Sequence, residues 1–197
     1  CISIIVNYIN MEFIDLDKLE IIENIGQGGF SEVFKVLDIE TGQIYAAKVS
    51  LKEINENSND LIKNLSREIN IISKLNHPSI IKFISFSPKD FDDRFFPVIV
   101  TEYASNGSLN TILNLERKGI SLDCWNETKK LINIYGIASA MSYLHSHEII
   151  HRDLIPENVL QDDYLFPKIA DFGLSKIVEE NGESSSFKTT NTAKGTP

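Results

Sequence analysis

Two aspartates and an asparagine in the last quarter of the chain carry side chains that can bind metal ions and move protons. Asp153 and Asn158 lie five positions apart in HRDLIPEN, and Asp171 follows in DFG. Together they form an oxygen-rich set of the kind that suits Mg²⁺, a hard cation. Asp153 would then be free to accept a proton from an incoming hydroxyl. A solvated turn explains any single acidic loop residue as well, so the interpretation depends on the whole set.

A lysine in an apolar segment is a second candidate. Lys48 follows two alanines in YAAK, and an unpaired buried charge is costly, so it needs a partner. Glu68 comes three positions after Leu65 and four before Ile72, on the apolar face of the helix predicted over 60–75. These two residues predict an ion pair that directs Lys48 toward a phosphate. A purely structural bridge is the alternative.

The segment IGQGGFSEV supplies a third candidate, a loop that could bind an anion. Gly26, Gly28 and Gly29 let the backbone turn tightly and bring N–H groups close to a phosphate. An ordinary glycine-containing hairpin explains this segment equally well when it is considered alone.

The elements that must position these residues follow from the hydrophobic pattern. Alternating apolar residues predict strands over 19–26, 32–39, 44–51, 80–87 and 96–103, the first three as an antiparallel meander. A spacing of three to four residues predicts a helix over 60–75, capped by Asp60 and ended by NHP at 76–78. Residues 105–109 open a short helical segment. The order predicts an α+β fold whose strand-rich and helical halves join near 102–107.

A second long helix is predicted over 125–145. Its periodic apolar residues are Leu131, Ile134, Ala138, Met141 and Leu144.

Together the segments resemble the signature motifs of the protein kinase family. GQGGFSEV resembles the glycine-rich loop with Ser31 in place of the third glycine, YAAK the strand-3 lysine motif, HRDLIPEN the catalytic loop and DFG the metal-binding motif. The resemblance covers residues 19–197 in the family's order. It implies a protein-kinase-like bilobal fold with an antiparallel-sheet N-lobe, one helix and an incomplete helical C-lobe. The implied boundaries are an extension at 1–18, an N-lobe at 19–101, a hinge at 102–107 and a partial C-lobe at 108–197 that ends in the activation segment.

The resemblance also implies roles for individual residues. Asp153 would orient and deprotonate the substrate hydroxyl, and Lys48, paired with Glu68, would contact the phosphates of ATP. Asn158 and Asp171 would bind Mg²⁺. The residues expected to surround the nucleotide are Ile25, Gly26, Gly28, Gly29, Ser31, Val33, Ala46, Lys48, Thr101, Glu102, Ala104 and Leu160. Among these, Thr101 would be the gatekeeper, and the backbones of Glu102 and Ala104 would bind adenine.

Further implications concern regulation and substrate. Ile72, His151 and Phe172 would stack as part of a regulatory spine. Arg152 implies control by phosphorylation of the activation loop, through an upstream kinase or autophosphorylation. The candidate sites are Ser184, Ser185, Ser186, Thr189, Thr190 and Thr192. DLxPEN and GTP resemble serine/threonine kinases, and VTEYASNGSL with KIADFGLSK resembles the tyrosine-kinase-like branch, so the expected partners are ATP and a protein with serine or threonine.

Ile155 departs from the family pattern. The family has a lysine there, which steadies the γ-phosphate, and losing one such preorganised donor typically costs about 10²–10³ in rate. We therefore expect weakened phosphate transfer with ATP binding kept. The alternatives are a pseudokinase that acts as a nucleotide-binding or scaffold module, and a nonfunctional fragment.

The two ends of the chain suggest the fragment. The chain starts at Cys1, has its first methionine at Met11 and stops at Pro197 before the family's APE segment. The apolar face of the 125–145 helix would then lack packing partners, so low stability is expected.

Composition narrows the class of protein. A net charge of -9 and a pI near 4.9 disfavour a nucleic-acid partner. No apolar run approaches the length of a membrane span, which disfavours a membrane partner. The two cysteines, Cys1 and Cys124, form no disulfide framework and predict a reducing, cytoplasmic location.

Overall fold

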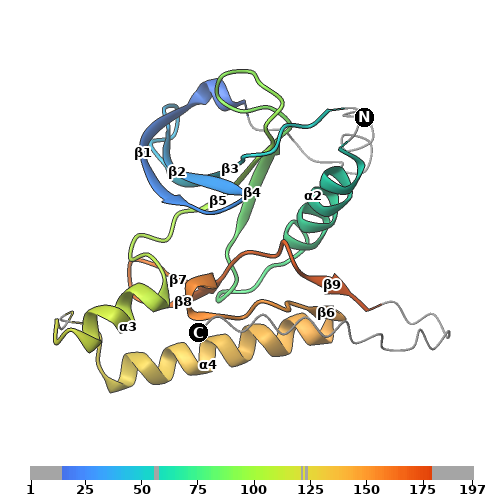
Figure 1. The fold of residues 1–197 in the computed structure, drawn as a ribbon. Coiled ribbons are helices and arrows are strands. Elements are labelled where there is room, and N and C mark those ends of the chain that lie inside the picture. Colours follow the sequence, from blue (N-terminus) through green and yellow to red (C-terminus); the bar gives the residue numbers. More distant parts are fainter. Residues whose placement is uncertain (1–14, 56–57, 121, 123, 179–197) are drawn as a thin grey trace.

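Five antiparallel strands form one sheet in the first half of the chain. The computed structural model describes residues 15–55, 58–120, 122 and 124–178. After a short 3₁₀ turn η1 (Leu16–Lys18), the strands are β1 (Leu19–Gln27), β2 (Ser31–Asp38), β3 (Ile44–Ser50), β4 (Phe83–Ser87) and β5 (Val98–Glu102). Their order in the sheet is β1-β2-β3-β5-β4 (Figure 1). The five predicted strands and the α+β class are therefore confirmed.

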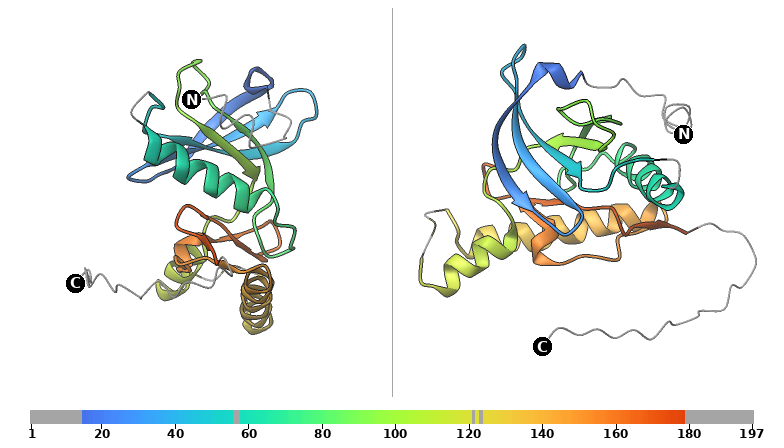
Figure 2. Two further views of the ribbon diagram at one scale, coloured as in Figure 1. Left: turned by 90° about the vertical axis from the view of Figure 1, so that its right-hand side faces the viewer. Right: turned by 45° about the horizontal axis from the view of Figure 1, so that its top comes forward.

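One helix, α2 (Asn59–Ile72), packs against this sheet. Figure 2 shows it lying beside the strands, and its apolar face joins a core cluster with two residues of the sheet, Phe86 and Ile99. The members of the cluster that α2 contributes are Ile62, Leu65 and Ile69. The 3.6-residue period identified this element because a helix half-buried on a sheet must keep one continuous apolar face.

The ends of α2 differ from the prediction. The N-cap is Ser58, not Asp60, because the carbonyl oxygen of Ser58 already accepts the hydrogen bond from the Ile62 N–H at 2.9 Å. The α-helix ends at Ile72 rather than at 75, since the amides of Lys74 and Leu75 donate to the third residue before each. The helix therefore ends in a tighter, 3₁₀-type turn, in which the carbonyls of Ile71 and Ile72 accept hydrogen bonds from the third residue after each.

The second half contains two helices and two small two-stranded sheets, of which one is a hairpin. The helices are α3 (Leu109–Arg117), capped by Ser108, and α4 (Glu127–Ser146), capped by Asn126. Strand β6 (Ile149–Ile150) pairs with β9 (Lys176–Ile177), and β7 (Val159–Gln161) pairs with β8 (Pro167–Ile169), after the 3₁₀ turn η2 (Pro156–Asn158). These small sheets lie between the large sheet and α4 (Figure 1). Among the described residues, no helix is long and apolar enough to span a membrane.

Helix α4 buries a different face from the one that its largest apolar residues define. Its buried residues are Asn133, Gly136, Ala140 and Leu144, whereas Leu131, Ile134 and Tyr135 are 64–77% exposed. The cause is close packing, because a Cβ at Gly136 would lie 2.6 Å from Cγ of Pro167 and 2.8 Å from Oγ of Ser79. Small residues let the helix approach the β8 hairpin. Of the predicted apolar set, Leu144 is buried and Met141 packs against the core, whereas Leu131, Ile134 and Ala138 are exposed.

The core continues across the two halves. One cluster contains Ile72 of α2, Ile80 and Ile81 after it, and Ala140 and Leu144 of α4, together with Ile149, Ile169 and Phe172. The predicted strand over 80–87 begins only at Phe83, because the amide of Ile81 donates instead to the carbonyl of Ile169, at 2.9 Å. The segment between α2 and β4 is thus bonded to the strand that leads to Asp171.

Candidate active site

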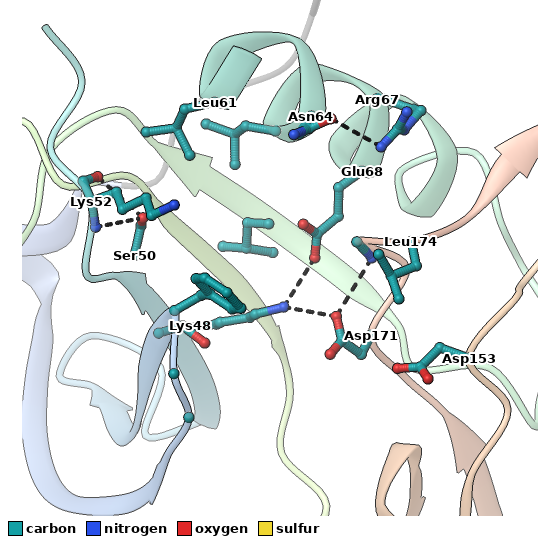
Figure 3. A pocket seen from close by; sticks show the side chains of 17 residues that line it. Lys48, Ser50, Lys52, Leu61, Asn64, Arg67, Glu68, Asp153, Asp171 and Leu174 are labelled. Carbon is teal, nitrogen blue, oxygen red and sulfur yellow. Dashed lines mark hydrogen bonds and ion pairs between the residues drawn. The ribbon is translucent and has the colours of Figure 1, made fainter. Parts of the chain in front are cut away.

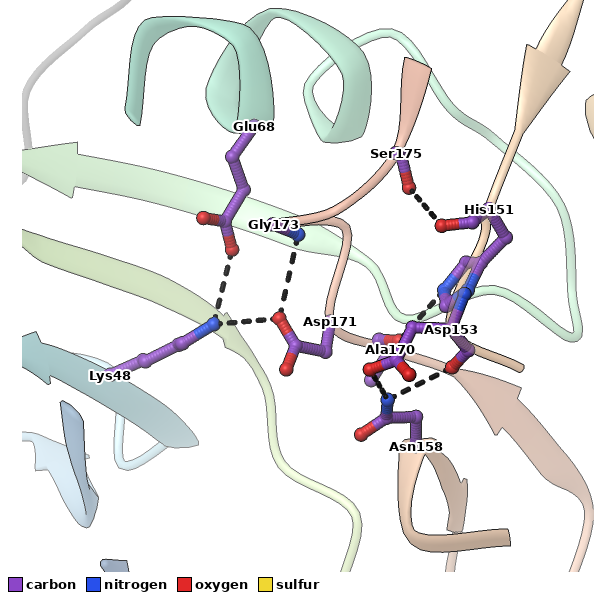
Figure 4. A network of polar contacts seen from close by, with 9 residues as sticks. All are labelled: Lys48, Glu68, His151, Asp153, Asn158, Ala170, Asp171, Gly173 and Ser175. Carbon is purple, nitrogen blue, oxygen red and sulfur yellow. Dashed lines mark hydrogen bonds and ion pairs between the residues drawn. The ribbon is translucent and has the colours of Figure 1, made fainter. Parts of the chain in front are cut away.

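Lys48 is the point at which three separate elements meet. From β3, its Nζ lies 3.2 Å from Oε1 of Glu68 on α2 and 3.0 Å from Oδ1 of Asp171 (Figure 4). The predicted ion pair between Lys48 and Glu68 is therefore confirmed. Its second carboxylate partner, Asp171, was expected in the same site but not as a contact of Lys48. The ammonium group is thereby held between α2 and the segment that follows β8.

The charges of this triad stabilise one another. Burial alone would lower the pKa of Lys48, but the carboxylates of Glu68 and Asp171 outweigh it and raise the pKa. Burial alone would raise the pKa of Asp171, and the Lys48 ammonium reverses this and lowers it. Lys48 and Asp171 are therefore both charged at neutral pH, as the phosphate and metal contacts predicted for them require.

Asp153 and Asn158 form the second part of the site. The side-chain nitrogen Nδ2 of Asn158 donates to Oδ2 of Asp153 at 2.8 Å and to its carbonyl oxygen at 3.0 Å. The turn η2 brings the two together, because the amide of Asn158 also donates to the carbonyl of Ile155. The five positions between Asp153 and Asn158 therefore form one compact loop, which fixes the orientation of the Asp153 carboxylate.

The backbone at this site adopts uncommon conformations. Arg152 and Asp171 have positive φ values of 68° and 61°, in the left-handed region that residues with a Cβ rarely enter. Such conformations typically cost about 1–3 kcal/mol and cluster at functional sites. The side chain of Arg152 donates from Nε to the carbonyl of Leu174. Arg152 thus connects the Asp153 loop to the segment that follows Asp171.

The expected spine residues lie in one cluster. The rings of His151 and Phe172 pack edge to face with centroids 5.0 Å apart, and Ile72 belongs to the same core. Burial lowers the pKa of His151, whose Nε2–H donates to the carbonyl of Ala170 at 3.0 Å. The neutral imidazole is therefore a structural support for the residue directly before Asp171.

A cavity of about 670 Å³ joins these groups (Figure 3). It brings together seven predicted site residues from five segments, namely Gly28, Gly29, Ser31, Lys48, Glu68, Asp153 and Asp171. Gly28, one of the lining residues, closes the glycine-rich loop with a hydrogen bond from its amide to the Ser31 carbonyl at 2.8 Å. The cavity therefore corresponds to the part of the site expected to hold phosphates.

The residues expected around adenine lie on neighbouring strands. Val33 pairs with both Gly26 and Lys48, and Ala46 pairs with Thr101. Nine of the predicted site residues are not among the described residues that line the cavity. They are Ile25, Gly26, Val33, Ala46, Thr101, Glu102, Ala104, Asn158 and Leu160. Their predicted nucleotide contacts remain predictions.

The composition of the oxygen ligands fits a magnesium ion shared with a substrate. Within the described residues, Oδ1 of Asn158 and Oδ2 of Asp171 accept no hydrogen bond, and no group of three or more His, Cys, Asp and Glu residues could hold a metal by itself. Mg²⁺ is usually held by one or two protein oxygens together with phosphates and water. The pair Asn158 and Asp171 fits that mode.

Several residues that line the cavity were not predicted. Asn64 and Arg67 extend it along α2 (Figure 3), Lys52 lines it with its ammonium 5.1 Å from the ring of Phe30, and Gly173 donates from its amide to Asp171 Oδ1 at 3.5 Å. The helical period could have identified Asn64, which lies one turn before Glu68 on the same face. The predicted phosphorylation sites at 184–192 lie outside the described residues.

Comparison with known proteins gives a consistent match. The family model of the protein kinase domain matches residues 19–197. Cysteine-rich receptor-like protein kinase 10 of Oryza sativa subsp. japonica is 36% identical over 162 residues, 81% of this chain and 23% of that protein. Probable serine/threonine-protein kinase kinX of Dictyostelium discoideum is 36% identical over 177 residues, 87% of this chain and 15% of that protein.

A third relative is serine/threonine-protein kinase polo of Drosophila melanogaster. It is 36% identical over 158 residues, which make up 80% of this chain and 26% of that protein. The chain therefore spans about a quarter or less of the length of these three relatives.

Proposed function

Because the chain belongs to the protein kinase domain family, we propose that it is a serine/threonine protein kinase that transfers the γ-phosphate of ATP to protein hydroxyls. The observation that carries this proposal is the contact of Lys48 with both Glu68 and Asp171, at the cavity that Asp153 also lines. In protein kinases, phosphoryl transfer requires a strand lysine paired with a helix glutamate and a metal-binding aspartate in place, and these three residues are the candidates for those roles.

Each residue has a specific task in the proposed reaction. Asp153, oriented by Asn158, accepts the proton of the substrate hydroxyl while the hydroxyl oxygen forms a bond to the γ-phosphorus. The bond between the γ-phosphorus and the bridging β–γ oxygen breaks, and ADP leaves with that oxygen. Lys48 binds the α- and β-phosphates. Asn158 and Asp171 would hold Mg²⁺, which neutralises phosphate charge when bound.

Ile155 weakens this reaction in the proposal. Its side chain is 42% exposed, and its backbone is part of the same loop, since its amide donates to the carbonyl of Asp153 at 3.1 Å. The loop geometry is therefore compatible with an apolar residue, and what is missing is a cation near the γ-phosphate. One such donor typically accounts for about 10²–10³ in rate.

The finer assignments belong to the same proposal. The chain is assigned to the tyrosine-kinase-like branch, on the resemblance of its hinge and DFG segments. Its regions are an extension at 1–18, an N-lobe at 19–101, a hinge at 102–107 and part of a C-lobe at 108–197. We also propose a cytoplasmic location, and phosphorylation of the activation segment by an upstream kinase or by the protein itself.

The test is transfer of the γ-phosphate to serine, threonine and tyrosine peptides, measured in single turnovers. Four variants of the full chain are compared with the natural one: Asp153→Asn, Lys48→Met, Ile155→Lys and Ile120→Lys. Ile120 is also an exposed isoleucine, at 52%, and lies after α3, so it controls for an added surface lysine. We expect slow transfer to serine and threonine that is lost in the first two variants, rises about 10²–10³-fold with Ile155→Lys and is unchanged with Ile120→Lys.

A pseudokinase is the second candidate, and Ile155 is the observation that favours it. Binding of ATP without transfer, in both the natural chain and Ile155→Lys, would establish that alternative. Equal transfer rates in both would show that Ile155 does not limit the reaction.

A further inference from the structure

Three cationic side chains line the cavity, and they differ in how far their charge is already satisfied. Lys48 is held by two carboxylates, at 3.2 and 3.0 Å. Arg67 is half-buried and donates to Oδ1 of Asn64, on its own helix, at 3.0 Å. Lys52 is exposed, and within the described part of the chain no carboxylate forms an ion pair with it. Its charge is therefore the one most accessible to an anionic ligand.

The backbone around Lys52 is fixed beside the glycine-rich loop. The hydroxyl of Ser50, the last residue of β3, accepts the Lys52 amide and donates to the Lys52 carbonyl, both at 3.1 Å. The amide of Leu51 donates to the carbonyl of Phe30 at 2.9 Å. These bonds hold Lys52 next to the turn of the loop, so its position does not depend on the side chain.

The side chain of Lys52 is held only weakly. Its ammonium lies 5.1 Å from the centre of the Phe30 ring, which is 72% exposed. A cation over an exposed aromatic ring gains little, because water screens the attraction. An anionic group that enters the cavity can therefore draw the ammonium toward itself at small cost.

A second hollow also borders Lys52, but the ammonium is directed to the main cavity. This hollow, of about 510 Å³, is lined by Glu53 and Asp60 among others. Neither carboxylate lies within ion-pair distance of Lys52. Phe30, over which the ammonium lies, lines the main cavity and not the hollow.

The place of Lys52 in the cavity separates it from the reacting atoms. Figure 3 shows Lys52 and Asp153 on opposite sides of Lys48. The substrate hydroxyl must meet Asp153, and the γ-phosphate must lie beside that hydroxyl for transfer to occur. Lys52 is therefore not aimed at the γ-phosphate, and it is left for a part of the protein substrate that extends along the cavity from the acceptor.

We propose that Lys52 is a specificity-determining residue that binds an acidic side chain of the protein substrate, and that the enzyme thereby prefers acceptors with a nearby aspartate or glutamate. This inference rests on the proposed function. A compact cavity of about 670 Å³ is roughly 11 Å across, which an extended peptide crosses in about three residues at ~3.3 Å each. The acidic residue is thus expected at least about three positions from the acceptor.

The overall charge of the chain acts against this preference but does not decide it. A net charge of -9 repels an acidic peptide from a distance. Charges farther away than the Debye length of about 10 Å at about 0.1 M salt are largely screened, so the contact inside the cavity outweighs them.

The experiment measures kcat/KM for a neutral peptide with one serine, in which a single aspartate replaces each neighbouring residue in turn. Asparagine at the same position is the uncharged control. We expect aspartate at one position to raise kcat/KM about three- to fivefold through a lower KM, as one exposed ion pair allows. Lys52→Met should remove this preference, whereas Lys63→Met, which deletes an exposed lysine of α2 outside the cavity, should keep it.

Charge reversal is the strictest arm of the same experiment. In Lys52→Glu the preference should invert, so that lysine at the selected peptide position gives a higher kcat/KM than aspartate. A merely structural role of Lys52 would change kcat/KM equally for all peptides, and that result would overturn the inference.

Peptide binding provides a readout that does not depend on transfer. Dissociation constants of the fluorescein-labelled aspartate and asparagine peptides are measured by anisotropy in the presence of ADP. The aspartate peptide should bind about three- to fivefold more tightly to the natural chain and to Lys63→Met, and equally tightly to Lys52→Met.

The remaining outcomes separate this inference from the proposed function. Equal kcat/KM with aspartate and asparagine at every position, or a preference that persists in Lys52→Met, would overturn the inference and leave the proposed function intact. Weaker ATP binding by Lys52→Met with an equal loss for all peptides would assign the ammonium to the nucleotide, and would also overturn it. Aspartate-selective binding without transfer would support the Lys52 site and overturn the proposed function. Absence of both transfer and peptide binding would overturn both.

Discussion

Asn158 donates from a single nitrogen to two oxygens of Asp153, the carboxylate Oδ2 at 2.8 Å and the carbonyl at 3.0 Å. The carboxylate is therefore aimed by an amide that belongs to its own loop. The same amide leaves Oδ1 for a metal ion, so one side chain serves both the proposed base and the proposed metal.

Replacing Asn158 should therefore affect the chemical step more than binding. We expect Asn158→Ala to lower the transfer rate by about 10²–10⁴, the range that a positioned proton acceptor contributes. Affinity for ATP without magnesium should change little. Single-turnover transfer and ATP titration measure the two effects, with Asn114→Ala as the control, because Asn114 accepts a hydrogen bond from Arg117 on exposed α3. Equal losses in both variants would contradict the role of Asn158.

The pKa of Asp171 should depend on Lys48. The Lys48 ammonium holds this pKa below its ordinary value, whereas burial acts in the opposite direction. We expect Lys48→Met to raise it, as measured by carboxyl ¹³C NMR. In the natural chain the lowered pKa of Asp171 stabilises the folded state at pH values above about 3.9, the pKa of an aspartate in the unfolded chain. This stabilisation is lost as the pH falls below that value. In Lys48→Met this loss on acidification should disappear.

Lys52→Met is the matched control for that measurement. Lys52 lines the same cavity, but its ammonium lies over the ring of Phe30 at 5.1 Å rather than beside a carboxylate. An equal shift of the Asp171 pKa in both variants would show that distant charge, not the contact with Lys48, is responsible.

Gly136 should not tolerate a methyl group. An exposed helical glycine replaced by alanine usually gains about 1 kcal/mol of stability. At Gly136 the added Cβ would lie 2.6 Å from Pro167, and overpacking typically costs about 1–3 kcal/mol. We expect Gly136→Ala to lower the free energy of unfolding, as measured with urea. Ala138→Ser, on the exposed side of α4, should change it by less than about 0.5 kcal/mol. A stabilised Gly136→Ala variant would mean that α4 and β8 are farther apart.

Protonation of His77 should lower the stability of the fold at mildly acidic pH. Burial lowers the pKa of His77, and its Nδ1 accepts the Ser79 amide at 3.1 Å, a contact that protonation would break. The unfolded chain, with a histidine pKa of about 6.5, binds the proton more readily, so the free energy of unfolding decreases as the pH falls below that value. Urea midpoints at pH 7.5 and 5.5 measure this slope.

We expect His77→Asn to reduce the slope, and His145→Gln, at the exposed end of α4, to leave it unchanged. Burial also lowers the pKa of His151, but this residue contributes equally in all three proteins. The same slope in His77→Asn as in the natural chain would contradict the assignment.

Much of the fold was predictable because its signals are local. Alternation identified the five strands of the sheet, and the helical period identified α2, since each pattern records which side chains of one element face a neighbour. The period also predicted that α4 is a helix, although not which face of it is buried. The contact between Lys48 and Glu68 was predictable for a related reason. Each is a charge on an apolar face, and a buried charge requires a partner.

The ends of α2 and the buried face of α4 could not be predicted from the sequence. Asp60 is a common cap residue, yet the helix begins after Ser58, because the first backbone hydrogen bonds decide the cap. On α4, the apolar period predicts Leu131 and Ile134 in the core, but Gly136 and Ala140 are buried instead, because the close approach to Pro167 selects small residues.

The sequence by itself determined the family, the elements and the types of residue available for the reaction: a lysine, a glutamate, two aspartates and an asparagine at characteristic spacing. Only the tertiary structure decided that Lys48 contacts Asp171 as well as Glu68, and that Glu102 reaches Lys168. These partners lie 123 and 66 positions apart. No local pattern encodes such contacts, because they depend on how the large sheet, the two small sheets and the helices pack on one another.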